Sequence, residues 1–244
     1  MGERDTVMNA ALYDAATIIL PMIFAIVFHE VAHGLMARRL GDPTASERGR
    51  LSLNPLRHVD PFGTIILPAA LHLAGLPVFG WAKPVPVNYN RLRHPKRDMA
   101  LVGAAGPATN FVLAAASSVV IGLIARALGP AGTPGAVLTF LFYNLRNFVE
   151  FNCFLGLFNL LPLPPFDGSR ILRGVAPMPL ARLLDRIEPF GIILFALVFV
   201  VLPQLAPSLH LADRILLPPV GWLLDQFGQL ASWVAGSPGL QPGA

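Results

Sequence analysis

Apolar residues gather in long runs along this chain, and polar residues are confined mostly to the stretches between them. The five longest runs cover about residues 15–40, 62–81, 99–128, 136–163 and 189–206. A helix needs roughly 20 apolar residues to cross the hydrocarbon core of a bilayer. The pattern therefore predicts an all-α polytopic membrane protein with four to six membrane segments, in which every run except 62–81 is a span.

Composition supports this fold class. Hydrophobic residues make up 54% of the 244 residues and charged residues only 13%, about half the charged share of an ordinary soluble domain. This shortage of charge argues against a soluble globular domain, and the apolar content argues against disorder. The net charge of +4 does not predict a nucleic-acid partner, because basic residues in a membrane protein mark its cytoplasmic loops. The single cysteine, Cys153, excludes an internal disulfide and a cysteine-rich metal site.

The basic residues indicate the orientation in the membrane. They cluster in the stretches 38–57, 83–98 and 169–188, whereas the loop at 128–136 carries no charge. The positive-inside rule places the three basic stretches in the cytoplasm and the uncharged loop outside. If residues 62–81 crossed the membrane, the first two basic stretches would lie on opposite sides. We therefore expect this segment to enter the membrane and return, or to lie along its inner face.

Two further segments have a different character. Residues 80–88 contain Pro84 and Pro86 and predict a small extended edge strand, since proline cannot serve a central strand. The C-terminal tail, residues 207–244, holds a weaker apolar segment at 213–235 that contains three charged residues and two prolines. This segment is either an amphipathic helix at the membrane surface or a short final span.

The strongest chemical signal is the sequence His29-Glu30-Val31-Ala32-His33 inside the first predicted span. On a helix, residues i and i+4 share one face and lie about 6 Å apart along the axis, so two imidazoles at these positions can bind one zinc ion. Glu30 is rotated about 100° from His29 and can reach a water bound to the metal. Two ligands and one general base are the division of labour in the helix of a metalloprotease.

The position of this motif in an apolar run needs an explanation. An ionisable residue in the middle of a membrane costs at least about 2.5–3.5 kcal/mol. A zinc ion would compensate for that cost by neutralising Glu30 and binding both imidazoles. The alternative is a polar cluster that lines a proton or ion path.

Catalytic zinc usually has three protein ligands and one open position, and Asp167 is the best candidate for the third. Three prolines and a glycine around it unwind the helix and let a short carboxylate project into a cavity. Considered alone, these residues fit a simple turn at the membrane edge better. Beside a histidine pair within the membrane, the ligand is the better interpretation.

Together, these motifs resemble those of the site-2 protease family of intramembrane zinc metalloproteases. The resemblance covers about residues 20–175 and rests on HEVAHG (29–34), the stretch 50–61 with GWAKPVPVN (80–88), GPATN (106–110) and NLLPLPPFDG (159–168). It implies that residues 1–206 form the intramembrane protease core of a compact prokaryotic member without a PDZ or CBS domain. One departure is Phe166, where family members usually have leucine.

The resemblance also implies a role for each site residue. One zinc ion per chain would be held by His29, His33 and Asp167, and Glu30 would be the general base and acid. The two remaining residues, Asn159 and Asn110, are expected at the substrate and the oxyanion. Asn159 would orient the substrate backbone or stabilise the oxyanion, and Asn110 would support the site.

The implied activity is zinc-dependent hydrolysis of peptide bonds in the transmembrane segments of other proteins. The enzyme would be a multi-pass protein of the cell membrane, with its basic loops and active-site opening toward the cytoplasm. The alternative is a non-proteolytic membrane protein with a structural zinc site, or a metal or proton conduit. The presence of Glu30 favours the enzyme, because a structural site does not need a free carboxylate beside its ligands.

Overall fold

The computed structural model describes residues 2–75, 80–129, 132–206, 208 and 214–236, with side chains from residue 12 onward. These residues form helices and contain no β-strand. The long helices are α1 (Gly2–Arg39), α4 (Pro95–Leu128), α5 (Ala136–Asn159) and α11 (Leu217–Ala235). The short helices are α2 (Thr44–Glu47), α3 (Leu67–Leu73), α6 (Asp167–Val175), α7 (Met178–Ile187), α8 (Gly191–Ala196) and α9 (Leu202–Leu205). Single turns are η1 (Pro55–His58), η2 (Pro61–Ile66), η3 (Tyr89–Arg91), η4 (Glu188–Phe190) and η5 (Leu197–Val201).

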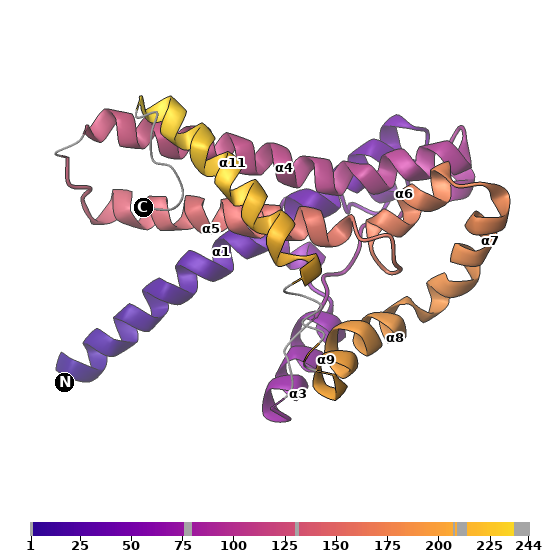
Figure 1. The fold of residues 1–244 in the computed structure, drawn as a ribbon, viewed down its shortest axis with the longest axis horizontal. Helices are drawn as coiled ribbons and strands as arrows, with labels where there is room; N and C mark the ends of the chain where they lie inside the picture. The colour runs from indigo at the N-terminus through magenta and orange to yellow at the C-terminus, as the bar shows by residue number, and fades with distance from the viewer. Residues whose placement is uncertain (1, 76–79, 130–131, 207, 209–213, 237–244) are drawn as a thin grey trace.

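Helix α4 is the centre of the bundle and contacts α1, α5, α6 and α11. Figure 1 shows α4 and α5 side by side with α11 crossing them, while α7, α8 and α9 extend away from the bundle. Small residues on α4 allow close approach. A Cβ added at Gly103 would lie 3.2 Å from the carbonyl oxygen of Asp167 in α6. A Cβ added at Gly122 would lie 2.4 Å from the carbonyl oxygen of Ala231 in α11. Small residues at such contacts are typical of helices that pack in a membrane.

Helix α4 contributes to two buried apolar clusters, and a polar contact lies between them along the helix. One cluster contains Ala37, Leu92 and Val102, and the other contains Ala114, Val149 and Cys153. The polar contact joins Asn110 of α4 to Asn152 of α5, two side chains with no exposed surface, through a hydrogen bond of 2.7 Å. This bond fixes the register of α4 against α5 close to the metal centre described below.

Three helical stretches are long and apolar enough to cross a membrane, namely Leu12–Arg39, Pro95–Leu128 and Met178–Leu205. They include most or all of the predicted spans at 15–40, 99–128 and 189–206. The remaining predicted span forms α5, a helix of 24 residues that does not belong to this set. The predicted number of four to six membrane segments is therefore not confirmed by the described residues.

The tail segment predicted at 213–235 forms α11, which packs against α4 and α5. Its residues Leu223, Leu224 and Phe227 pack against the apolar cluster between those helices. Residue 207 and the stretches 209–213 and 237–244 of the tail lie outside the described residues.

The segment predicted to enter the membrane and return, residues 62–81, leaves the bundle, and its last residue lies next to its start. Its described helical part, η2 and α3, covers residues 61–73, or about 20 Å of helix, which is shorter than the hydrocarbon core. Residues 76–79 lie outside the described part. The Trp81 N–H donates to the Gly63 carbonyl (3.1 Å) and the Lys83 N–H to the His58 carbonyl (2.8 Å). The two ends of this segment are therefore joined by backbone hydrogen bonds.

The edge strand predicted at 80–88 is not confirmed. Residues 81–88, called the strap below, have no regular secondary structure, because a strand needs a neighbouring strand and the described residues contain none. The strap N–H groups at positions 81, 83 and 85 bind other parts of the chain instead. Pro84 and Pro86 between them have no N–H to offer a second strand.

Candidate metal centre

Two histidines of α1 form the first half of the site. His29 and His33 lie one turn apart on the helix and are 4% and 5% exposed. Their Nε2 atoms are 3.0 Å apart, and the ring planes are almost perpendicular, at 86°. The i, i+4 spacing therefore brings two metal-binding atoms to one point, as the sequence predicted.

Asp167 reaches the same point from a distant part of the sequence. Helix α5 ends at Asn159, and the prolines that follow turn the chain before α6 begins at Asp167. Gly168 allows this turn to be tight, because a Cβ there would lie 2.2 Å and 2.3 Å from the carbonyl oxygens of Leu160 and Leu161. As a result, the Asp167 Oδ2 atom lies 3.1 Å from both imidazole Nε2 atoms.

The partners of the two Nδ1 atoms determine the tautomer of each imidazole. His33 Nδ1 lies 2.7 Å from the carbonyl oxygen of Val102, which can only accept a hydrogen bond. His29 Nδ1 lies 2.6 Å from Asn110 Oδ1. The orientation of the Asn110 amide is set by its Nδ2, which donates to Asn152 Oδ1 (2.7 Å). Both imidazoles therefore carry their proton on Nδ1 and direct a lone pair from Nε2 toward Asp167.

This arrangement brings three electron-pair donors together with no hydrogen between them. The three atoms lie 3.0–3.1 Å from one another, and Asp167 Oδ2 is buried without a hydrogen-bond partner. A cation between them removes the repulsion and satisfies all three. Two ligands about 2.05 Å from a tetrahedral zinc ion are about 3.3 Å apart, which is close to these distances. Two imidazoles and one carboxylate also match a catalytic zinc site with an open fourth position, so the residues fit the ion.

The Asp167 carboxylate has a second partner that the sequence interpretation missed. Arg170, one turn later on α6, places Nη1 3.1 Å from Asp167 Oδ1, and this contact leaves Oδ2 for the metal. The i, i+3 spacing of the two residues was the available signal.

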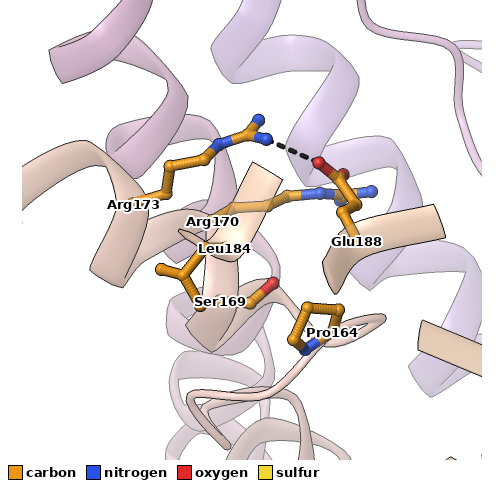
Figure 2. A pocket seen from close by; sticks show the side chains of 6 residues that line it. All are labelled: Pro164, Ser169, Arg170, Arg173, Leu184 and Glu188. Carbon is orange, nitrogen blue, oxygen red and sulfur yellow. Dashed lines mark hydrogen bonds and ion pairs between the residues drawn. The ribbon is translucent and has the colours of Figure 1, made fainter. Parts of the chain in front are cut away.

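A narrow pocket lies beside Arg170. It is lined by Arg170, Arg173, Glu188, Ser169, Leu184 and Pro164, and Figure 2 shows these side chains gathered between α6 and the chain that follows it. Arg173 forms ion pairs with Asp185 (2.7 Å) and Glu188 (2.5 Å). These pairs connect α6 to α7 and η4, and they hold the helix that begins with Asp167 against the next segment.

Gly106 of α4 makes room for both imidazoles. A Cβ at this position would lie 2.5 Å from His33 Nε2 and 2.6 Å from His29 Cε1. Carbon atoms in contact normally stay about 3.5–4.0 Å apart. The glycine of GPATN therefore allows α4 to cross α1 at the metal centre.

Glu30 lies outside the three-ligand cluster. Its Oε2 accepts a hydrogen bond of 2.7 Å from the Val85 N–H of the strap. The carboxylate is thus free of ligation, as the assignment of a general base requires.

The two predicted asparagines lie in different surroundings. Asn110 has no exposed surface and binds His29, so it lies behind a ligand. Asn159, the last residue of α5, donates from Nδ2 to the Leu155 carbonyl of its own helix (3.0 Å). The amide of Asn159 is not joined to the three ligands by any of its hydrogen bonds in the described structure.

Known proteins similar to this chain carry the names of metalloproteases. The Bacillus subtilis protein named "Putative zinc metalloprotease YwhC" is 38% identical over 183 residues, which cover 75% of this chain and 80% of the relative. The protein named "Putative zinc metalloprotease Rip2" of Mycolicibacterium smegmatis is 29% identical over 91% of this chain and 78% of its own length. Its namesake in Mycobacterium tuberculosis strain H37Rv is 32% identical over 86% of this chain and 74% of its own length. No family model and no solved structure matches the chain.

Proposed function

The chain belongs to the zinc metalloprotease family of the Bacillus subtilis relative, and from this premise we propose that it is an intramembrane endopeptidase of the site-2 class. It hydrolyses peptide bonds in the transmembrane segments of other membrane proteins and uses one zinc ion per chain. One observation carries the proposal: three ligand atoms converge on a helix that is long and apolar enough to span a membrane, next to a carboxylate that ligates nothing.

Each residue of the centre has a chemical task in this reaction. His29, His33 and Asp167 would hold zinc, which supplies polarisation of the scissile carbonyl and a lower pKa for the attacking water. Glu30 takes the proton of that water and returns it to the leaving amine. Asn110 keeps the His29 proton on Nδ1, so Nε2 stays a ligand.

The substrate class follows from the position of the site along α1. Two of the three ligands, His29 and His33, lie within the candidate span Leu12–Arg39, so a peptide bond reaches them from within the membrane. A helical substrate hides its carbonyls in hydrogen bonds and must unwind locally before attack. The basic stretches support an active site that opens toward the cytoplasm in a protein of the cell membrane.

A structural zinc site or an ion conduit is the competing function. Structural zinc sites are almost always closed by four protein ligands, whereas an open position is typical of catalytic sites. The described residues bring three ligands together. This count, with Glu30 outside the set, favours hydrolysis.

The test compares the wild type with Glu30→Gln. Each is co-expressed with a library of single-span proteins that carry a tag at each end, and each is then purified for zinc analysis. We expect specific shortened products with the wild type and none with Glu30→Gln, at equal zinc content. Zinc-loaded wild type that cleaves no member of the library, or a Glu30→Gln variant that cleaves as well as the wild type, would contradict the proposal.

A further inference from the structure

The carboxylate of Glu30 is held in one orientation by a hydrogen bond from the strap. Its Oε2 accepts the Val85 N–H at 2.7 Å, while Oε1 accepts no hydrogen bond from the described residues. A hydrogen bond to an ionised carboxylate is about twice as strong as one between neutral groups. One oxygen is therefore held and the other is available for a proton.

The strap that carries Val85 is fixed on both sides of it. On the N-terminal side, the Lys83 N–H binds the His58 carbonyl (2.8 Å), and Arg50 Nη2 donates to the Lys83 carbonyl (2.9 Å). On the C-terminal side, the Asn88 N–H donates to Asp42 Oδ2 (2.6 Å). The Val85 donor is thus held by a segment that is anchored before and after it.

The helix surface beneath the strap is shaped to receive Val85. Gly34 lies one turn after Glu30 on the same face of α1, and a Cβ there would lie 2.8 Å from Val85 Cγ1. The absence of that Cβ lets the Val85 side chain, 6% exposed, rest on α1. With the side chain docked at Gly34, the N–H is directed at Glu30.

The sequence of the strap leaves one donor for this task. Pro84 and Pro86 have no N–H, so Val85 supplies the only backbone donor of these three residues. The prolines also restrict the chain to extended conformations. This stiffness reduces the freedom that the contact with Glu30 must overcome.

We propose that Val85 is a positioning residue of the hydrolytic reaction, whose backbone N–H holds the general base Glu30 in its working orientation. This inference rests on the proposed function. A glutamate without such a donor turns about three side-chain bonds, and a general base acts only within hydrogen-bond reach of its proton. Loss of the donor therefore slows the chemical step without releasing zinc or weakening substrate binding.

The first test does not depend on proteolysis. Hydrogen exchange of the Val85 amide is followed by NMR in protein labelled with 15N-valine, for the wild type, Glu30→Gln and Glu30→Ala. We expect slow exchange in the wild type and in Glu30→Gln, which keeps an acceptor oxygen, and exchange faster by about tenfold in Glu30→Ala. Equal exchange in all three proteins would remove Glu30 as the acceptor and overturn the inference.

The second test separates positioning from structure. Val85→Pro removes the N–H, whereas Ala82→Pro adds a proline to the strap where none of the hydrogen bonds among the described residues is lost. The probe is an internally quenched single-span peptide with about 20 apolar residues and a central Asn-Pro-Gly break. We expect Val85→Pro to lower kcat at least tenfold with unchanged KM and zinc content. Ala82→Pro should stay within about threefold of the wild type.

Gly34→Ala provides an independent variant, because the added Cβ would displace the side chains of Leu51 and Val85 while the Val85 N–H remains. It should reproduce the fall in kcat of Val85→Pro. A Val85→Pro enzyme with wild-type kcat, or an equal loss in Ala82→Pro, would overturn the positioning role. If the wild type cleaves no probe, the proposed function fails, and the exchange measurement still decides whether Val85 holds Glu30.

Discussion

Substitution of Gly106 by alanine tests whether the metal ligands keep their positions only because α4 has no side chain where it crosses α1. The added Cβ would lie 2.5 Å from His33 Nε2 and 2.6 Å from His29 Cε1, about 1 Å closer than a normal carbon contact. Because His33 Nε2 is itself a ligand atom, relief of this overlap must move a ligand or separate the helices. Metal sites need their ligands within about 0.5 Å of the working geometry.

The expected magnitude follows from this displacement. Disturbance of the groups that orient metal ligands typically lowers metal affinity by about 10–100-fold, or about 1.4–2.7 kcal/mol. We expect Gly106→Ala to fall in or above this range. The intrinsic preference of alanine for a helix, about 1 kcal/mol over glycine, acts in the opposite direction on folding and does not restore the ligand positions.

Gly122 provides the matched control on the same helix. A Cβ there would lie 2.4 Å from the Ala231 carbonyl oxygen and 2.7 Å from Val234 Cβ, an overlap as severe as that at Gly106. The position is about 24 Å further along α4, at 1.5 Å per residue over sixteen residues. Gly122→Ala should therefore weaken the contact with α11 but leave zinc affinity within about threefold of the wild type.

The assay is titration of the zinc-loaded protein with a chelator, after size exclusion has shown that each variant is monodisperse. Gly106→Ala that holds zinc as tightly as the wild type would refute the geometry of the centre. Equal losses in Gly106→Ala and Gly122→Ala would also refute it, since a general loss of packing would then explain both.

Three further predictions follow from the site and the fold. Asp167→Ala should lose most of its zinc by elemental analysis, and full zinc content would remove this residue from the ligand set. Asn110→Ala should retain the fold by circular dichroism but bind zinc about 10–100-fold more weakly, because the His29 tautomer is no longer fixed; wild-type affinity would contradict that role. Cysteines placed at Ser52 and Asn90 in a Cys153→Ala background should react alike with a membrane-impermeant thiol reagent, only after lysis, and labelling of one from outside would refute the re-entry of the segment between them.

The histidine pair could be derived from the sequence because its geometry is local, since it needs only the i, i+4 spacing of one helix. Asp167 was expected as the third ligand only in combination with that pair, because its own surroundings fit a simple turn. The partners behind the ligands could not be derived in this way. Asn110 binds His29, which lies 81 positions earlier in the sequence. Val102 binds His33 through its backbone carbonyl, a group that every residue has, so the sequence gives no sign of this contact.

The strap shows a second limit of sequence interpretation. The alternation of prolines predicts an extended edge strand, but periodicity cannot state what an N–H group binds. The Val85 donor is used by Glu30, 55 positions earlier in the sequence. A strand was therefore predicted where the chain instead forms hydrogen bonds with several separate elements.

Phe166, the departure from the usual leucine of the related family, is explained by its surroundings. Its ring lies 4.5 Å from that of Phe158 in α5, 5.8 Å from Phe195 in α8 and 6.3 Å from Phe199 in η5, all at steep interplanar angles. Edge-to-face pairs of this kind contribute about 0.5–1.5 kcal/mol each beyond their burial. The residue next to the ligand Asp167 thus belongs to an aromatic cluster that only the folded chain brings together.

X-ray absorption at the zinc edge of the purified chain tests the central claim most directly, because it reports the atoms bound to the metal. The account predicts two imidazole nitrogens and one carboxylate oxygen among the ligands at about 2.0–2.2 Å, with one imidazole lost in a His33→Ala variant that still retains metal. A sulfur ligand at about 2.3 Å, or a spectrum unchanged by His33→Ala, would contradict it.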